Sequence, residues 1–146
     1  NLALRALRMA STGQALVAPA FQHLQGAFFL RTGERDRGRT MLRDVVRQVR
    51  ALPGPDNWVQ ALFTLESIAR TARAAGDAEF ARWAAEEMVN HDPNYAGSHF
   101  ALGLSARQAG DRATAAREFA AALGLWSRAD PSLAEISEIR AFQSGR

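Results

Sequence analysis

A five-residue pattern occurs twice in this chain, 34 residues apart. Arg73-Ala74-Ala75-Gly76-Asp77 returns as Arg107-Gln108-Ala109-Gly110-Asp111. Further positions correspond at the same offset: Ile68 with Leu102, Ala69 with Gly103, Ala72 with Ala106, and Ala81 with Ala115. A fixed period of this length is typical of proteins built from stacked repeats. The chain is therefore expected to contain similar units that share a core.

Each unit is predicted to be a pair of helices. Gly76 and Gly110 can adopt the left-handed conformation that ends a helix, and Asp77 and Asp111 can cap the helix that follows. Alanine accounts for 30 of the 146 residues. It has the highest helix propensity, and its short side chain lets helices approach closely. No segment alternates at period two for long enough to predict a strand, so we expect an all-α fold.

Glycine and proline divide the chain into predicted helices. An opening helical segment falls within residues 1–18. The other predicted helices are Pro19 to Arg31, Arg35 to Ala51, Asp56 to Ala75, Asp77 to about Asn90, Tyr95 to Ala109, Asp111 to about Trp126, and Asp130 to Phe142. Pro19 is expected in the first turn of its helix, where proline is tolerated.

The 34-residue unit resembles the tetratricopeptide repeat, a helix–turn–helix unit. In a copy from Leu62 to Tyr95, the family positions are occupied by Ile68-Ala69, Gly76, Ala81 and Pro93. In a copy from Ala96, they are occupied by Leu102-Gly103, Gly110, Ala115, Phe119 and Ala122. A degenerate copy begins near Pro19, with Gly26, Phe29, Gly33, Gly38 and Leu42 in register, and is followed by an insertion through Pro53-Gly54-Pro55.

The resemblance implies one domain, a right-handed superhelical stack of about three hairpins. The degenerate repeat with its insertion takes residues 19–55, and the two clearer repeats take residues 56–95 and 96–129. Because a solenoid needs capped ends, residues 1–18 and 130–146 are expected to cap the stack.

The resemblance also implies a non-catalytic scaffold that binds a peptide or protein, with acidic partners among the candidates, in a concave groove. The first helices of the repeats would line this groove. The candidate residues are His23, Phe63, Glu66, Arg70, Arg73, Phe100, Leu104 and Arg107. One subclass of the family grips a C-terminal carboxylate with lysine, asparagine and arginine. Those positions here hold His23, Ala27, Ser67, Gly97 and Ala101, so that clamp is not expected.

Charged groups in the predicted groove leave two alternatives open. Arg73 and Arg107 occupy the same repeat position and would place two guanidiniums side by side, a suitable arrangement for carboxylates. Each could instead pair with the aspartate four residues later, Asp77 or Asp111. Glu66 and Arg70 have the spacing of a pair within one helix.

Arginine provides an alternative binding surface. Residues 1–50 hold nine arginines and three acidic residues. Arg35, Arg39, Arg43 and Arg47 follow one another at i, i+4 and share a helix face, here called the basic stripe. Such a stripe can bind phosphates or nucleic acid, although a solvated outer face balanced by Glu34, Asp36 and Asp44 is favoured. Aromatic residues do not interleave with it, which argues against single-stranded nucleic acid.

No residue pattern predicts an enzyme. The chain has no cysteine, and it contains neither a nucleophile elbow nor a glycine-rich phosphate loop. His23, His91 and His99 lack the helical spacing of a zinc site, so no metal or other cofactor is expected.

Abundant alanine and arginine without lysine are typical of GC-rich codons and favour a bacterial source. No run of about 18 apolar residues is present, so no membrane span is expected. The sequence is compatible with a soluble protein of the cytoplasm or periplasm. Because the chain opens on Asn1, it is expected to be part of a longer protein with neighbouring domains.

Overall fold

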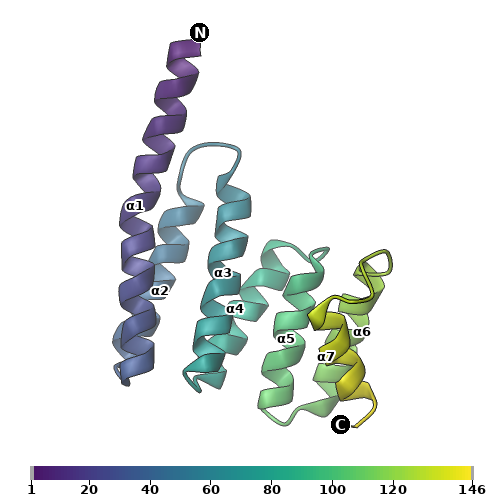
Figure 1. The fold of residues 1–146 in the computed structure, drawn as a ribbon. Helices are drawn as coiled ribbons and strands as arrows, with labels where there is room; N and C mark the ends of the chain where they lie inside the picture. The colour runs from purple at the N-terminus through teal and green to yellow at the C-terminus, as the bar shows by residue number, and fades with distance from the viewer. Residues whose placement is uncertain (1, 146) are drawn as a thin grey trace. The chain divides into compact units, whose positions relative to one another are not determined.

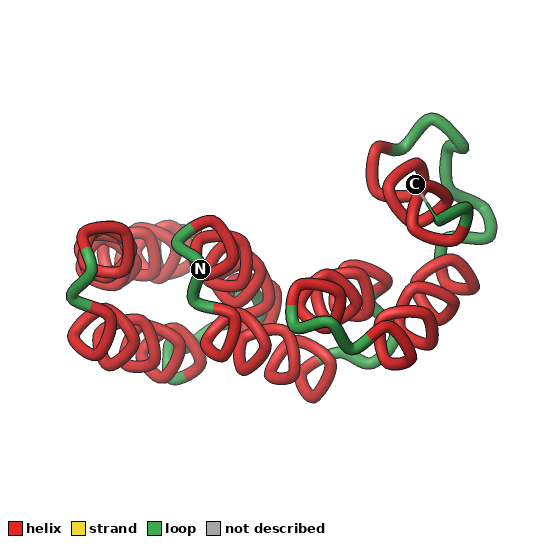
Figure 2. The backbone as a smooth tube through the Cα atoms, turned by 90° about the horizontal axis from the view of Figure 1, so that it is seen from below, coloured by secondary structure: helices red, strands yellow, loops and turns green. Residues whose placement is uncertain are grey.

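The computed structural model describes the backbone of residues 2–145 and the side chains of residues 17–145. Seven helices lie in this range: α1 (Leu2–Thr32), α2 (Arg35–Arg50), α3 (Asn57–Ala74), α4 (Ala78–His91), α5 (Ala96–Gln108), α6 (Arg112–Leu125) and α7 (Ala134–Gln143). Figures 1 and 2 show helices joined by loops, and the described residues include no strand. The prediction of an all-α fold is confirmed.

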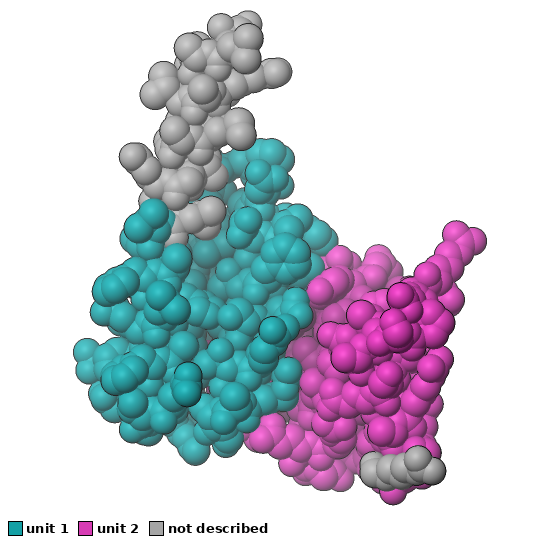
Figure 3. Space-filling view, viewed as in Figure 1, with its two compact units in different colours: residues 1–77 teal, residues 78–146 magenta. Residues whose placement is uncertain are grey.

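The chain divides into two compact units, residues Asn1–Asp77 and Ala78–Arg146 (Figure 3). In unit 1, α2 packs against both α1 and α3, and α1 also contacts α3. In unit 2, α5 packs against α4 and α6, and α6 contacts α7. The boundary between the units falls within the predicted 56–95 repeat, at the turn between its two helices.

The turns that follow α3 and α5 have the same backbone structure. Gly76 and Gly110 have φ values of 69° and 79°. The Asp77 N–H donates to the Ala72 carbonyl, and the Asp111 N–H donates to the Ala106 carbonyl, each at 2.9 Å. A bond from the residue after a left-handed glycine back into the last helical turn is the Schellman cap. The repeated sequence therefore builds one repeated turn.

The helix boundaries carry the same period. α3 ends at 74 and α5 ends at 108, and α4 and α6 begin at 78 and 112 and end at 91 and 125. Each of these boundaries recurs after 34 residues. The earlier pair, α1 and α2, joins at Gly33, which also has a positive φ of 95°.

Glycines allow close helix crossings at corresponding positions in the two units. A Cβ atom added at Gly38 in α2 would lie 2.9 Å from the Gly26 carbonyl oxygen of α1, and one at Gly26 would lie 2.7 Å from Leu42 Cγ. In unit 2, a Cβ atom at Gly103 would lie 2.5 Å from the Phe119 ring. Because real Cβ atoms do not approach so closely, these glycines fix the helix separations.

Each unit has its own apolar core. In unit 1, Val45 and Val49 of α2 pack with Ala61 of α3. In unit 2, helices α5, α6 and α7 contribute the buried residues Leu104, Ala106, Ala115, Phe119, Ala122 and Ile139, against which Phe100, Leu123, Trp126 and Phe142 pack.

The prediction that a helix begins at Pro19 is wrong. Pro19 lies inside α1, which runs from Leu2 to Thr32 as one helix, so residues 2–18 form no separate element. A proline within a helix removes one backbone hydrogen bond and costs about 3 kcal/mol. The flanking residues are rich in alanine and leucine, which favour helix, and the Pro19 side chain is buried.

The last helix begins later than predicted, at Ala134 instead of Asp130. The Asp130 carboxylate accepts hydrogen bonds from the Ser132 N–H and hydroxyl, each at 2.8 Å. This local turn competes with helix, which explains the delay.

Candidate functional site

Unit 1 contains an open cleft between α1 and α3, with a volume of about 430 Å³. Ten residues line this unit 1 cleft: Pro19, Ala20, His23 and Leu24 from α1, Val45 and Val49 from α2, and Gln60, Phe63, Thr64 and Ser67 from α3. Predominantly apolar clefts with a few polar groups are typical binding sites for ligands.

Helical spacing explains how the lining residues come together. The α1 and α3 residues recur at intervals of three or four, so each helix presents one continuous face to the cleft. Val45 and Val49, four residues apart on α2, are 1% and 2% exposed and form the floor.

The two sides of the cleft carry exposed apolar side chains. Leu24 on α1 is 68% exposed, and Phe63 on α3 is 53% exposed. Both can gain burial from a bound apolar side chain, and each fully buried side chain of this size contributes about 1.5–3 kcal/mol. The site is therefore suited to an apolar ligand group.

One polar contact crosses the cleft. The Ser67 hydroxyl oxygen lies 3.0 Å from His23 Nε2, so α1 and α3 are linked by a hydrogen bond. Burial lowers the pKa of His23 from its ordinary value of 6.5, because the charged imidazolium loses hydration. The neutral ring and the hydroxyl can provide a direction-dependent hydrogen bond within an otherwise apolar site.

The predicted groove residues do not all face this cleft. His23 and Phe63 line it, whereas Glu66 and Arg70 form an ion pair along α3, with 3.2 Å between Oε1 and Nη2. The predicted pairing of Glu66 with Arg70 is thus confirmed. Arg73 lies in the last turn of α3 and is half-buried.

The predicted groove residues of unit 2 have other roles. Leu104 is 8% exposed and belongs to the core, and the Phe100 ring packs against Phe119 and Trp126 at centroid distances of 6.0 and 5.7 Å. Arg107 Nη2 lies 2.6 Å from Glu138 Oε1 of α7. Leu104 is therefore a core residue, and Phe100 is partly buried against the core that α7 helps to form. A groove role for Phe100 stays a prediction.

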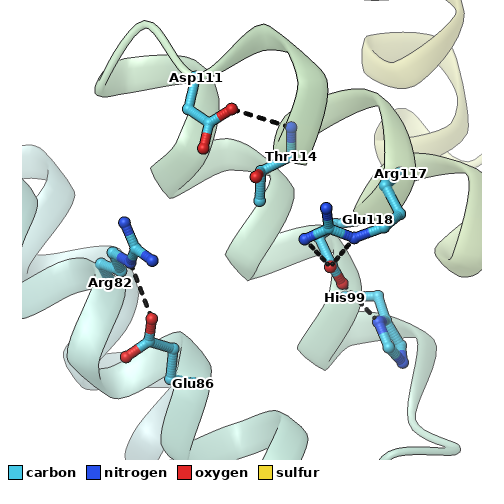
Figure 4. Close-up of polar contacts among 7 residues, drawn as sticks. All are labelled: Arg82, Glu86, His99, Asp111, Thr114, Arg117 and Glu118. Carbon is cyan, nitrogen blue, oxygen red and sulfur yellow. Dashed lines mark hydrogen bonds and ion pairs between the residues drawn. The ribbon is translucent and has the colours of Figure 1, made fainter.

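Asp111 caps a helix as predicted, and the Asp77 side chain contacts an arginine of α2. The Asp111 carboxylate caps α6 by accepting from the Thr114 N–H at 3.0 Å (Figure 4). Asp77, at the corresponding repeat position, is 2% exposed and pairs with Arg39 of α2. The partner of Arg107 is Glu138, so the alternative pairing of Arg107 with Asp111 is not observed.

The basic stripe is partly neutralised. Arg39 donates to both Asp77 carboxylate oxygens and is only 21% exposed in its side chain. Arg47 pairs with Asp44 on the same helix. Arg35 and Arg43 are exposed. Phosphate binding requires accessible cations, and the basic stripe has fewer accessible cationic side chains than the sequence predicts.

A second polar cluster lies in unit 2. His99 Nδ1 lies 2.8 Å from Glu118 Oε2, and Arg117 contacts the other oxygen of the same carboxylate (Figure 4). His99 Nε2 is 2.9 Å from the Pro93 carbonyl oxygen. The Arg82–Glu86 ion pair in the same figure lies along α4. Among the residues with described side chains, no group of three or more histidine, cysteine or acidic side chains could hold a metal ion.

Sequence reasoning missed several lining residues. Leu24 and Thr64 each follow a predicted residue by one position, and Gln60 precedes Phe63 by three. The helical spacing around His23 and Phe63 indicates that these neighbours share a helix face with them.

Within the described part of the chain, no helix combines the length and apolarity needed to cross a membrane.

Comparisons with known proteins do not identify a family. No family model matches this chain, and no curated protein shows significant similarity to it. The tetratricopeptide resemblance therefore stays a prediction from the sequence pattern.

Proposed function

We propose that this chain is a non-catalytic, tetratricopeptide-like scaffold that binds a peptide segment of a partner protein in the unit 1 cleft. The observation that carries the proposal is the cleft itself, about 430 Å³ in volume, with exposed Leu24 and Phe63 on opposite helices. The proposed superhelical stack of hairpins places this cleft on the concave side, where first helices of successive repeats are adjacent.

Two features support the repeat architecture. Gly76 and Gly110 close turns with equivalent hydrogen bonds, 34 residues apart. The close crossing at Gly26 and Gly38 in unit 1 corresponds in repeat position to the crossing at Gly103 in unit 2. Small residues at these positions are what the tetratricopeptide pattern requires of a hairpin.

The chemistry of the cleft indicates the kind of peptide. Leu24, Phe63 and the valine floor suit a large aliphatic or aromatic side chain. The His23–Ser67 pair suits one backbone or side-chain polar group beside it. Unit 1 holds eleven arginines and six acidic residues, so acidic residues flanking the apolar side chain favour association.

Selection from a peptide display library tests this proposal. Peptides are selected on the wild-type protein, and their affinities are measured by fluorescence anisotropy for wild type, Phe63→Ser and Leu125→Ser. Leu125 is a matched control because it is 42% exposed and lies in unit 2. We expect Phe63→Ser to weaken binding roughly tenfold or more, the equivalent of about 1.4 kcal/mol. A failure to select peptides, or equal weakening by both substitutions, would oppose the proposal.

A further inference from the structure

The exposed surface of α1 carries an apolar row that is separate from the unit 1 core. Val17, Phe21, Leu24 and Phe28 follow one another at intervals of four, three and four residues. Their exposed fractions are 66%, 61%, 68% and 60%. These four residues are called the apolar seam. Alternating steps of three and four residues are the pattern by which one helix packs along another.

The seam faces away from the contact between α1 and α2, and one of its residues, Leu24, also borders the unit 1 cleft. Each residue turns an α-helix by about 100°, so Gly26, nine residues after Val17, is turned by roughly 180° from it. Gly26 marks the face of α1 that touches α2, because a Cβ atom there would meet Leu42. The opposite face is therefore free to receive another helix.

The residues beside the seam favour an apolar partner surface. Ala18, Ala20, Gln25 and Ala27 flank it, and none is charged. Small flanking side chains let a second helix approach closely. The first charged residue along the same row is Arg31, which is exposed. Since no charges flank the seam to select an oppositely charged helix, its best complement is a seam of the same kind.

We propose that the seam pairs with the seam of a second copy of this chain, in antiparallel orientation. A two-fold axis between residues 22 and 23 places Phe21 against Leu24 of the partner subunit, and Phe28 against Val17 of the partner subunit. Each phenylalanine then meets an aliphatic side chain, as in a self-complementary interface. A parallel pair would instead place Phe21 and Phe28 against themselves and bring the two Arg31 charges together.

The area predicts a weak dimer. A buried aromatic side chain removes about 150–250 Å² from water, so the partly exposed seam offers on the order of 500 Å² per copy. Two copies would bury about 1,000 Å², at the lower end of specific interfaces. A dissociation constant on the order of 10 μM is expected.

Sedimentation velocity over roughly 1 to 300 μM protein, a range that brackets this constant, tests the proposal. We expect the 15.9 kDa monomer to convert to a species of twice its mass as concentration rises. Phe21→Glu with Phe28→Glu is expected to abolish the dimer without loss of helical circular dichroism. Leu24 of the seam borders the unit 1 cleft, but Phe21 and Phe28 do not line it. The double substitution therefore tests the dimer without altering the cleft, and failure here is distinguishable from failure of the proposed function. The control, Leu125→Glu, introduces the same side chain at an exposed apolar position of α6, outside α1 and the unit 1 cleft, and should leave the dimer intact.

A monomer at all concentrations, or a dimer that survives the double substitution, overturns the proposal. Orientation is tested separately, because the chain has no cysteine and an introduced one is its only thiol. A mixture of Val17→Cys and Phe28→Cys chains is expected to form the mixed disulfide on oxidation. A Val17→Cys homodimeric disulfide formed in preference to it would contradict the antiparallel arrangement.

Discussion

Arg39 and Asp77 form a bidentate ion pair that links α2 to the turn after α3. Arg39 Nε lies 2.8 Å from Asp77 Oδ2, and Nη2 lies 2.6 Å from Oδ1. The Asp77 side chain is almost completely buried. Two parallel hydrogen bonds between a guanidinium and a carboxylate are among the stronger polar contacts in proteins. This pair joins residues 38 positions apart within unit 1.

Arg39→Ala is expected to destabilise the protein by about 3 kcal/mol, because it removes the arginine partner of a buried carboxylate. Urea denaturation followed by circular dichroism measures the loss. Asp111→Asn is the matched control at the repeat position of Asp77, and it should cost less because Asp111 is exposed and caps a helix. Equal losses from the two substitutions would show that the Arg39–Asp77 pair has no special role.

Gly38→Ala is expected to lower stability by about 1–3 kcal/mol, because the new Cβ atom would collide with the α1 backbone. Gly124 of α6 provides a control, since a Cβ atom there meets nothing within 4 Å. Gly124→Ala should raise stability by less than about 1 kcal/mol, as alanine favours helix. Thermal unfolding of both variants checks the sign of each change, and a stabilised Gly38→Ala would exclude the close crossing.

His23 is expected to make stability depend on pH. Its pKa in the folded protein is lowered by burial, so below about 6.5 the unfolded chain binds a proton that the folded chain resists. The free energy of unfolding therefore falls as pH decreases from above this value through the folded pKa. His23→Gln should flatten this part of the profile in denaturant titrations at a series of pH values. A wild-type slope retained in full by the variant would assign it to other groups.

Phe100→Ala is expected to reduce mainly stability, and Phe63→Ala is expected to reduce mainly peptide binding. Phe100 packs against Phe119 and Trp126, so its truncation should cost about 2–3 kcal/mol. Phe63 is about half exposed, and its truncation should cost less than about 1 kcal/mol while weakening binding of a selected peptide. A larger loss of stability for Phe63→Ala than for Phe100→Ala would contradict the packing of Phe100 and support its predicted role in the groove.

Local features of the fold were accessible from the sequence. Gly33, Gly76 and Gly110 mark turns because their positive φ values disfavour other residues, and the observed helix ends follow them closely. Small residues at Gly26 and Gly103 also indicated where helices cross. These signals act within a few residues or repeat at one period, so a sequence pattern exposes them.

Long-range packing was less accessible. Asp77 stands at the sequence position of a helix cap, yet its carboxylate accepts from Arg39, 38 residues away. Phe100 has the spacing of a groove residue, but its ring packs against Phe119 and Trp126. Pro19 marks a helix start by local preference, whereas burial and its helix-forming neighbours keep it inside α1. In each case tertiary contacts between residues distant in the sequence outweigh a local preference.

The most direct test of the proposed function is an NMR titration of ¹⁵N-labelled protein with a peptide selected on the wild type. We expect the largest amide shifts and the intermolecular NOEs at His23, Leu24, Phe63 and Ser67, and we expect Phe63→Ser to reduce them. Shifts that cluster instead on α5 to α7 would contradict a binding site in the unit 1 cleft.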